Sequence, residues 1–278
     1  MPGSQQYAEH QRRVAAGIRP LRPCTPSCPA LLITGLPRSG KSLAEALLAR
    51  NARVMAGGEL ALVRKFATTQ DAAAGLRGLA RKLSRQPRSP LAQWYAQRAA
   101  ASGVKGISYV TDTSPANLTR LGYLALLHPE VPIVFCRRDP LDLGASLYFK
   151  NFRSGHHYSY SLATLGRAIA AAEKVMDHWL TVLPNPMLEL RYDDVVLNPD
   201  RGRTALFHHL GLDQQPHPAP PPATATAARL FPSRTSTDFD VISADLIGFG
   251  RRFHRQLEPL LAAYAAEKRR PELVPAPD

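Results

Sequence analysis

A glycine-bounded loop that ends in lysine and serine is the first candidate functional site in this sequence. Ala30–Ile33 is an apolar run typical of a buried strand, and Leu43–Arg50 contains strong helix formers. Between them the loop reads Gly35-Leu-Pro-Arg-Ser-Gly40-Lys41-Ser42. In a strand, loop and helix of this kind, backbone N–H groups and the positive end of the helix dipole converge on an anion. The spacing therefore predicts binding of a nucleotide or a sulfated nucleotide through its phosphate.

The same loop fits more than one class of protein. Its pattern, G-x-x-x-x-G-K-[ST], is that of ATP- and GTP-using proteins, which also hold magnesium with a carboxylate at a strand end. Asp112 follows an apolar run and Asp139 follows two arginines, so both are candidates for that carboxylate. A P-loop kinase or NTPase is one interpretation. A tight turn whose glycines only allow close packing is another.

Composition limits the class of protein. The chain has 278 residues, a formal charge of +13 and a pI near 10.1, which suits one α/β domain. No apolar stretch approaches the roughly 18–20 residues of a membrane helix, and residues 1–29 lack the apolar centre of a signal peptide. Cys24, Cys28 and Cys136 do not make a disulfide scaffold. We expect a cytoplasmic protein without membrane insertion.

Basic residues gather in two clusters, one within Arg77–Arg88 and one within Arg251–Arg270. Such clusters bind nucleic acid in other proteins, but no RNA- or DNA-binding signature accompanies them here. An anionic cofactor with an acidic substrate accounts for the same charge, and so does a solvated basic surface. We expect no nucleic-acid partner, although a nucleic-acid- or nucleotide-binding module without turnover stays an alternative.

Strands and helices alternate along the chain. We expect strands at 30–33, 53–56, 107–111, 131–137 and 187–192. We expect helices at 43–50, within 60–102, and at 117–127, 142–149, 162–183, 199–210 and from 243 past 261. This order predicts an α/β fold of three layers, a P-loop-like domain with a central parallel sheet and helices on both faces. We place the domain at 30–265, after an N-terminal arm at 1–29 and before a C-terminal tail at 266–278.

Ligands of parallel α/β sheets bind beyond the carboxyl ends of the strands. Polar clusters follow four of the expected strands: Arg38–Ser42, Glu59, Asp112–Ser114 and Arg137–Asp139. We therefore expect one site that combines residues from all four.

Five segments occur in a fixed order: Gly35–Ser42, Gly58-Glu59-Leu60, Asp112–Asn117, Cys136–Ser146 and Arg191–Val196. Together they resemble the sulfotransferase superfamily, and within it the bacterial branch similar to tyrosylprotein sulfotransferases, from about Ala30 to Leu212 and weakly to Leu261. Five motifs in family order are far more specific than one loop. The resemblance implies an enzyme that moves a sulfuryl group from 3′-phosphoadenosine 5′-phosphosulfate (PAPS) to a hydroxyl and releases adenosine 3′,5′-bisphosphate (PAP).

The resemblance also implies a donor site with two anion-binding parts. The loop residues Pro37, Arg38, Ser39, Gly40, Lys41 and Ser42 would cradle the 5′-phosphosulfate. Arg38 and Lys41 would also offset charge on the leaving phosphate. ATP has no 3′-phosphate, so a second part of the site separates this interpretation from the NTPase.

That second part would hold the 3′-phosphate. Arg138 would grip it through its planar guanidinium and Ser146 through its hydroxyl, although a surface arginine at a strand end is the alternative for Arg138. Two further residues complete the expected donor site. Tyr192 comes from the Arg191–Val196 segment, and Ser236 from a faint match to the family's segment that covers the cofactor.

Glu59 is the candidate general base. It follows two glycines at a strand end, and by resemblance this position takes the proton of the acceptor hydroxyl. Its alternatives are a helix cap or a partner of a nearby arginine. No metal is expected, because arginine and lysine supply the positive charge.

Two positions depart from the family pattern, since the family's threonine is Lys41 and the family's lysine is Thr113. One hypothesis is a swap, in which Lys41 supplies the ammonium that the other position normally provides. A weakened or repurposed enzyme is the alternative.

The family branch and the basic clusters favour a tyrosine in an acidic peptide or protein as the acceptor, with a carbohydrate or a small-molecule alcohol as alternatives. A homodimer is compatible with the resemblance. His156 and His157 lie after the expected 3′-phosphate helix, where they would line the acceptor pocket or lie on the surface.

Overall fold

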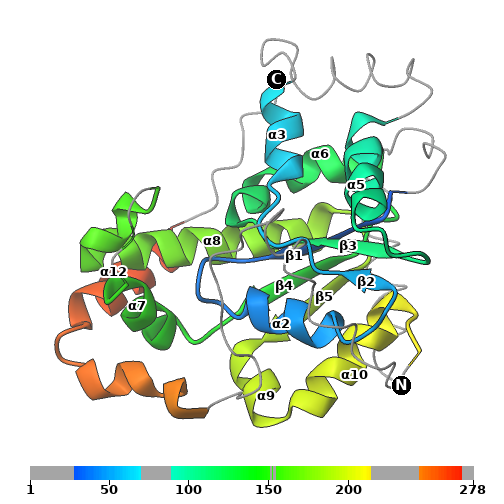
Figure 1. Cartoon of the computed structure of the whole chain (residues 1–278). Coiled ribbons are helices and arrows are strands. Elements are labelled where there is room, and N and C mark those ends of the chain that lie inside the picture. Colours follow the sequence, from blue (N-terminus) through cyan, green and yellow to red (C-terminus); the bar gives the residue numbers. More distant parts are fainter. Residues whose placement is uncertain (1–27, 70–88, 151, 153–154, 214–243, 271–278) are drawn as a thin grey trace.

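The centre of the protein is a parallel sheet of five strands (Figure 1). The computed structural model describes residues 28–69, 89–150, 152, 155–213 and 244–270. The strand order is β2-β3-β1-β4-β5. The strands are β1 (Ala30–Thr34), β2 (Val54–Met55), β3 (Tyr109–Asp112), β4 (Ile133–Arg137) and β5 (Met187–Arg191). Leu32 of the middle strand β1 pairs with Asp112 of β3 and with Ile133 of β4. The expected parallel sheet is confirmed.

Helices cover both faces of the sheet, as expected for a three-layer α/β domain. One face carries α3 (Leu62–Thr69), α5 (Pro90–Ala101), η2 (Pro115–Arg120), α6 (Leu121–Leu127) and α8 (Leu162–Val182). The other carries α2 (Lys41–Leu48), α9 (Tyr192–Leu197) and α10 (Pro199–Leu210). Figure 1 shows these two groups above and below the strands.

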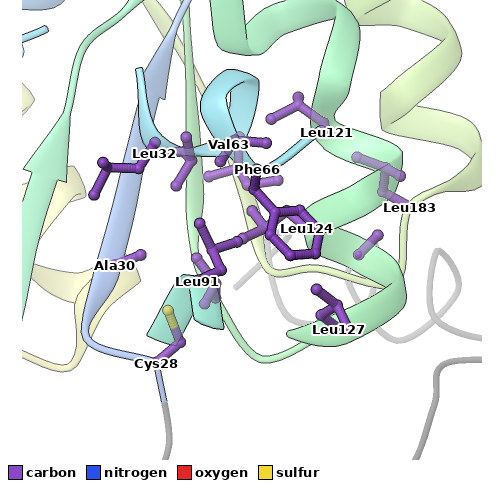
Figure 2. Packing of buried hydrophobic residues seen from close by; sticks show 14 of the residues in the cluster. Cys28, Ala30, Leu32, Val63, Phe66, Leu91, Leu121, Leu124, Leu127 and Leu183 are labelled. Carbon is purple, nitrogen blue, oxygen red and sulfur yellow. The ribbon is translucent and has the colours of Figure 1, made fainter. Parts of the chain in front are cut away.

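Alternation along β1 divides the core between the two faces. Ala30 and Leu32 pack with the first group of helices, whereas Leu31 and Ile33 pack with the second, because successive strand side chains point to opposite faces. All four are fully buried. Figure 2 shows the first cluster, in which Phe66 of α3 lies among leucines of α5 and α6.

The C-terminal part of the described chain packs mainly beside α7 (Pro140–Tyr148) and α8, and its first turn contacts α9. It consists of η4 (Ala244–Leu246), η5 (Phe249–Phe253) and α12 (Glu258–Arg269). The expectation of one helix from residue 243 past 261 was therefore wrong in its first half. Glycines account for the difference: Gly248 has φ +72, and a Cβ on Gly250 would lie 2.6 Å from the Leu141 carbonyl oxygen.

Several expectations fall outside the described residues. They are the N-terminal arm up to residue 27, the basic cluster within 77–88, Ser236 and the tail from residue 271. Within the helices that the structure does describe, none combines the length and the apolar character needed to cross a membrane.

Candidate active site

The loop between β1 and α2 is pressed against β4. Gly35 has φ +145, and a side chain there would lie 2.6 Å from the Cys136 carbonyl oxygen. Gly40 has φ +103 and immediately precedes the first residue of α2. Arg38 has φ +68, a left-handed conformation that is uncommon for a residue with a side chain. Such backbone outliers concentrate at functional sites.

The loop places its polar residues in different environments. Arg38 is exposed, Pro37, Gly40 and Ser42 are half-buried, and Ser39 is buried. The Ser39 hydroxyl has no hydrogen-bond partner among the described residues. A buried hydroxyl without a partner is uncommon, and an anion in the loop would satisfy it.

Arg38 brings Arg138 and Ser146 to the loop, although 100 and 108 residues separate them in sequence. The Arg38 Nε donates to the Ser146 hydroxyl at 3.0 Å. The Arg138 Nη1 donates to the Arg38 carbonyl oxygen at 3.2 Å. The guanidinium of Arg138 lies 4.2 Å from the centre of the Tyr192 ring. The four residues thus form one cluster from the loop, the end of β4, α7 and the start of α9.

Arg138 is buried without a carboxylate partner among the described residues. Its Nη2 donates to the Leu246 carbonyl oxygen at 3.0 Å, and its Nε has no partner. Burial lowers the pKa of Arg138. A desolvated guanidinium with an unused N–H is suited to an anion.

Arg137 has a different environment from its neighbour. It pairs with Asp177 of α8 and, at 2.8 Å, with Glu189 of β5. Successive residues at a strand end face opposite sides, which explains why only Arg138 reaches the loop.

Lys41 is the most deeply buried cation of the loop. Its side chain donates to the Leu36 carbonyl oxygen at 3.0 Å, and only 5% of the residue is exposed. Burial lowers the pKa of Lys41 to about 8, while nearby Cys136, Glu59 and Glu45 oppose the fall. No ion pair joins Lys41 to another residue in the described part of the chain.

Glu59 is exposed on the tight turn between β2 and α3. Its negative charge raises the pKa of Lys41 and also that of His156, whose pKa is lowered overall by burial. The His156 ring lies 4.4 Å from the Phe152 ring, and its Nδ1 is 3.1 Å from the Tyr158 hydroxyl. Glu59, Lys41 and His156 therefore share one electrostatic environment, while His157 is exposed.

The two carboxylates considered as magnesium ligands accept hydrogen bonds from backbone amides instead. Asp112 is fully buried and accepts four hydrogen bonds, from the Ala61, Leu62 and Ser114 amides and the Tyr95 hydroxyl. Asp139 caps α7 by accepting from the first amides of that helix. Within the described ranges, no group of three or more His, Cys, Asp or Glu side chains is arranged to hold a metal.

Two acidic residues that were not among the predicted site residues lie at the site. Glu45 of α2 accepts from the Gly58 amide at 2.9 Å and from a threonine hydroxyl of β3. Asp142 of α7 accepts from the Gly248 and Gly250 amides at 2.6 and 2.7 Å, and so fixes the segment that contacts Arg138. For Glu45 the available signal was a carboxylate within the apolar stripe of a helix, whereas Asp142 is part of the Cys136–Ser146 segment that carries the resemblance.

This geometry defines the class: an α/β domain with a P-loop-like turn and a second buried cation beside it. A family model described as "Sulfotransferase family" matches residues 29–216, and the chain belongs to that family. An uncharacterized protein of Aquifex aeolicus (strain VF5) is 26% identical over 188 residues, which cover 63% of this chain and 24% of that protein. The chain thus spans less than two thirds of this relative's length.

Solved sulfotransferase structures resemble the chain to different degrees. The sulfotransferase domain of the Synechococcus PCC 7002 olefin synthase has a TM-score of 0.50 and 18% identity, and the match covers 84% of this chain and 98% of that domain. A sulfotransferase from Alicyclobacillus acidocaldarius has a TM-score of 0.46 and 17% identity, with 90% and 97% covered. The first similarity shows that the chain has the fold of a sulfotransferase domain.

Replacing Lys41 by methionine is expected to stabilise the unliganded protein. The pKa of Lys41 falls from 10.5 to about 8 on folding, so at neutral pH burial of the ammonium costs about 3 kcal/mol. Between these values the unfolded chain binds more protons, so wild-type stability rises with pH there. We expect Lys41→Met to raise the free energy of unfolding by about 1–3 kcal/mol near pH 7, and by less as pH rises above about 8.

Urea denaturation of both proteins near pH 7 and near pH 9 measures this difference. Lys150→Met, at an exposed lysine, serves as the control and should leave the stability unchanged. A Lys41→Met variant that is less stable than wild type would show that the ammonium stabilises the fold.

Proposed function

We propose that this protein is a PAPS-dependent sulfotransferase that acts on an acceptor hydroxyl. One observation supports the donor most: the loop of Lys41 and the buried Arg138, with its unpartnered Nε, are joined through Arg38 and Ser146. PAPS carries an anionic group at each end of its ribose and would fit two such centres. A nucleoside triphosphate would use only the first.

Bound PAPS would supply an activated sulfuryl group. Residues 37–42 and the N-terminus of α2 would hold the 5′-phosphosulfate, and Arg138, Ser146 and Tyr192 would surround the 3′-phosphate. Glu59 takes the proton of the acceptor hydroxyl as the acceptor oxygen bonds to sulfur. The bond between sulfur and the 5′-phosphate oxygen breaks, and its electron pair stays on that oxygen. Arg38 and Lys41 offset the charge that develops there.

The position of Thr113 supports the swap hypothesis for Lys41. The Thr113 amide donates to the Gly58 carbonyl oxygen at 2.8 Å, so the family's lysine position lies beside the turn that carries Glu59. Lys41 interacts electrostatically with the same glutamate. An ammonium from α2 would therefore act close to the place that Thr113 leaves uncharged.

For the acceptor we favour a tyrosine in an acidic peptide. Arg64 and Lys65 are exposed on α3, which begins three residues after Glu59, and neither forms an ion pair with a described residue. Both would attract acidic flanks to the side of the site that holds the candidate base. We also propose a reducing compartment, because Cys28 and Cys136 are free and buried.

Calorimetry with nucleotides tests the donor site. We expect wild type to bind PAP about 10- to 100-fold more tightly than AMP, the equivalent of one or two charged hydrogen bonds, and without need of Mg²⁺. The Arg138→Gln variant should lose this preference for PAP while its affinity for AMP stays unchanged. Arg137→Gln is the matched control, since its side chain pairs with Asp177 and Glu189 instead. A preference for Mg·ATP would favour the NTPase.

Substitution of Glu59 tests the base. We expect Glu59→Gln to lower kcat by about 10²–10⁴-fold, because the general base is lost, with the affinity for PAP unchanged. Lys41→Thr, which restores the family's residue, should abolish transfer if the swap hypothesis holds. Transfer of ³⁵S from labelled PAPS gives the rates, with Glu258→Gln on α12 as a remote control. A fully active Lys41→Thr enzyme would contradict the swap.

A peptide array tests the acceptor. Tyrosine peptides with glutamate flanks should react at about ten times the rate of the same peptides with glutamine flanks, the equivalent of about 1.4 kcal/mol. Replacing both Arg64 and Lys65 by glutamine should reduce this difference. Equal rates for both flanks, or faster transfer to a carbohydrate or a simple alcohol, would reject the acidic peptide.

A further inference from the structure

The carboxylate of Glu45 lies between the helix that begins at Lys41 and the turn that carries Glu59. Its Oε1 accepts a hydrogen bond from the Gly58 amide at 2.9 Å and a second, short one from the Thr111 hydroxyl. The Thr111 oxygen in turn accepts from the Gly57 amide at 2.8 Å. Both amides that precede Glu59 are therefore tied, directly or through one hydroxyl, to this single carboxylate.

The turn has little freedom to adopt another shape. A Cβ at Gly57 would lie 2.1 Å from the Thr111 carbonyl oxygen, so the turn approaches β3 too closely for any other residue. Gly58 has φ +66, which favours glycine. Asp112 holds the residues after Glu59 through the Ala61 and Leu62 amides. Glu45 provides the corresponding hold on the residues before it.

Glu45 also acts on the loop cation. It lies four residues after Lys41, one helical turn along α2. Its charge raises the pKa of Lys41, as do Glu59 and Cys136, whereas burial raises the pKa of Glu45 itself and nearby Asp112 adds to that rise. This half-buried carboxylate thus hydrogen-bonds the turn before the candidate base and acts electrostatically on the candidate cation.

We propose that Glu45 is a positioning residue for sulfuryl transfer. It fixes the Gly57–Gly58 turn so that Glu59 is presented to the acceptor, and it keeps that turn in register with the helix that begins at Lys41. The inference rests on the proposed function. Glu45 itself neither contacts the donor nor takes the acceptor's proton in this role.

Two substitutions distinguish the effect of the Glu45 hydrogen bonds on the turn from the effect of the Glu45 charge. Glu45→Leu removes the acceptor oxygens and frees the Gly58 amide. Glu45→Gln keeps an acceptor oxygen for that amide but carries no charge. Glu173 of α8 offers a matched control, because it is a half-buried helical glutamate that accepts from the Tyr264 hydroxyl at 2.6 Å and pairs with Lys268. Glu173→Leu and Glu173→Gln should change stability without changing the kinetics.

For Glu45→Leu we expect kcat to fall by about 10- to 100-fold, the equivalent of the lost charged hydrogen bonds, while the affinity for PAP stays within about threefold of wild type. For Glu45→Gln we expect most of kcat to be retained. Its kcat/KM profile should change, because loss of the charge lowers the pKa of Lys41 and moves the alkaline limb to lower pH. Rates are measured with PAPS and the tyrosine peptide flanked by glutamate.

Hydrogen exchange provides a readout that does not depend on activity. The Gly58 amide should exchange faster in Glu45→Leu than in wild type, and at the wild-type rate in both Glu173 variants. An unchanged exchange rate, an unchanged kcat for Glu45→Leu, or an equal loss of kcat and PAP affinity would each overturn the inference. If wild type neither binds PAP nor transfers sulfuryl, the proposed function fails, and the exchange data then show separately whether Glu45 holds the turn.

Discussion

The candidate site is built around two positive charges that are removed from solvent. Lys41 and Arg138 are only 5% and 7% exposed, and their side-chain hydrogen bonds go to backbone carbonyl oxygens. Neither has a carboxylate ion pair within the described part of the chain. Burying a cation without a counter-ion is expensive, so the surrounding fold has to enforce it. The close approach of Gly35 to β4 and the stacking of Tyr192 on Arg138 are the contacts that do so.

Much of this arrangement could be predicted from the sequence, because it depends on short-range patterns. The apolar run before Gly35 and the alternation of strands with helices predict a parallel sheet, and all five strands lie within two residues of their expected bounds. The polar residues at the strand ends then converge on one edge for a topological reason. Arg38, Arg138, Ser146 and Tyr192 accordingly form one cluster.

The features that the sequence did not predict depend on tertiary contacts. The helix expected from residue 243 is interrupted because Gly250 packs against the Leu141 carbonyl, and Leu141 is distant in sequence. The roles of Glu45 and Asp142 depend on backbone amides of the Gly58 turn and of Gly248 and Gly250, which no local pattern reveals. A carboxylate in an apolar helical stripe indicates only that a buried donor must exist.

The distribution of charge follows from these contacts. Asp112 accepts hydrogen bonds from the Tyr95 hydroxyl and three backbone amides. Asp142 accepts from two amides of the C-terminal segment beside Arg138. Glu45 is committed to the turn before Glu59. Asp112, Asp142 and Glu45 therefore accept hydrogen bonds from backbone amides, the side-chain N–H groups of Lys41 and Arg138 that are bonded donate to carbonyl oxygens, and Glu59 stays exposed. This division is the one that the proposed function requires, with Lys41 and Arg138 as the candidate anion-binding groups and the exposed Glu59 as the candidate base. The same division is consistent with the hypothesis that Lys41 replaces a lysine at position 113, because Glu59 and Glu45, one helical turn further along α2, both act electrostatically on the Lys41 ammonium.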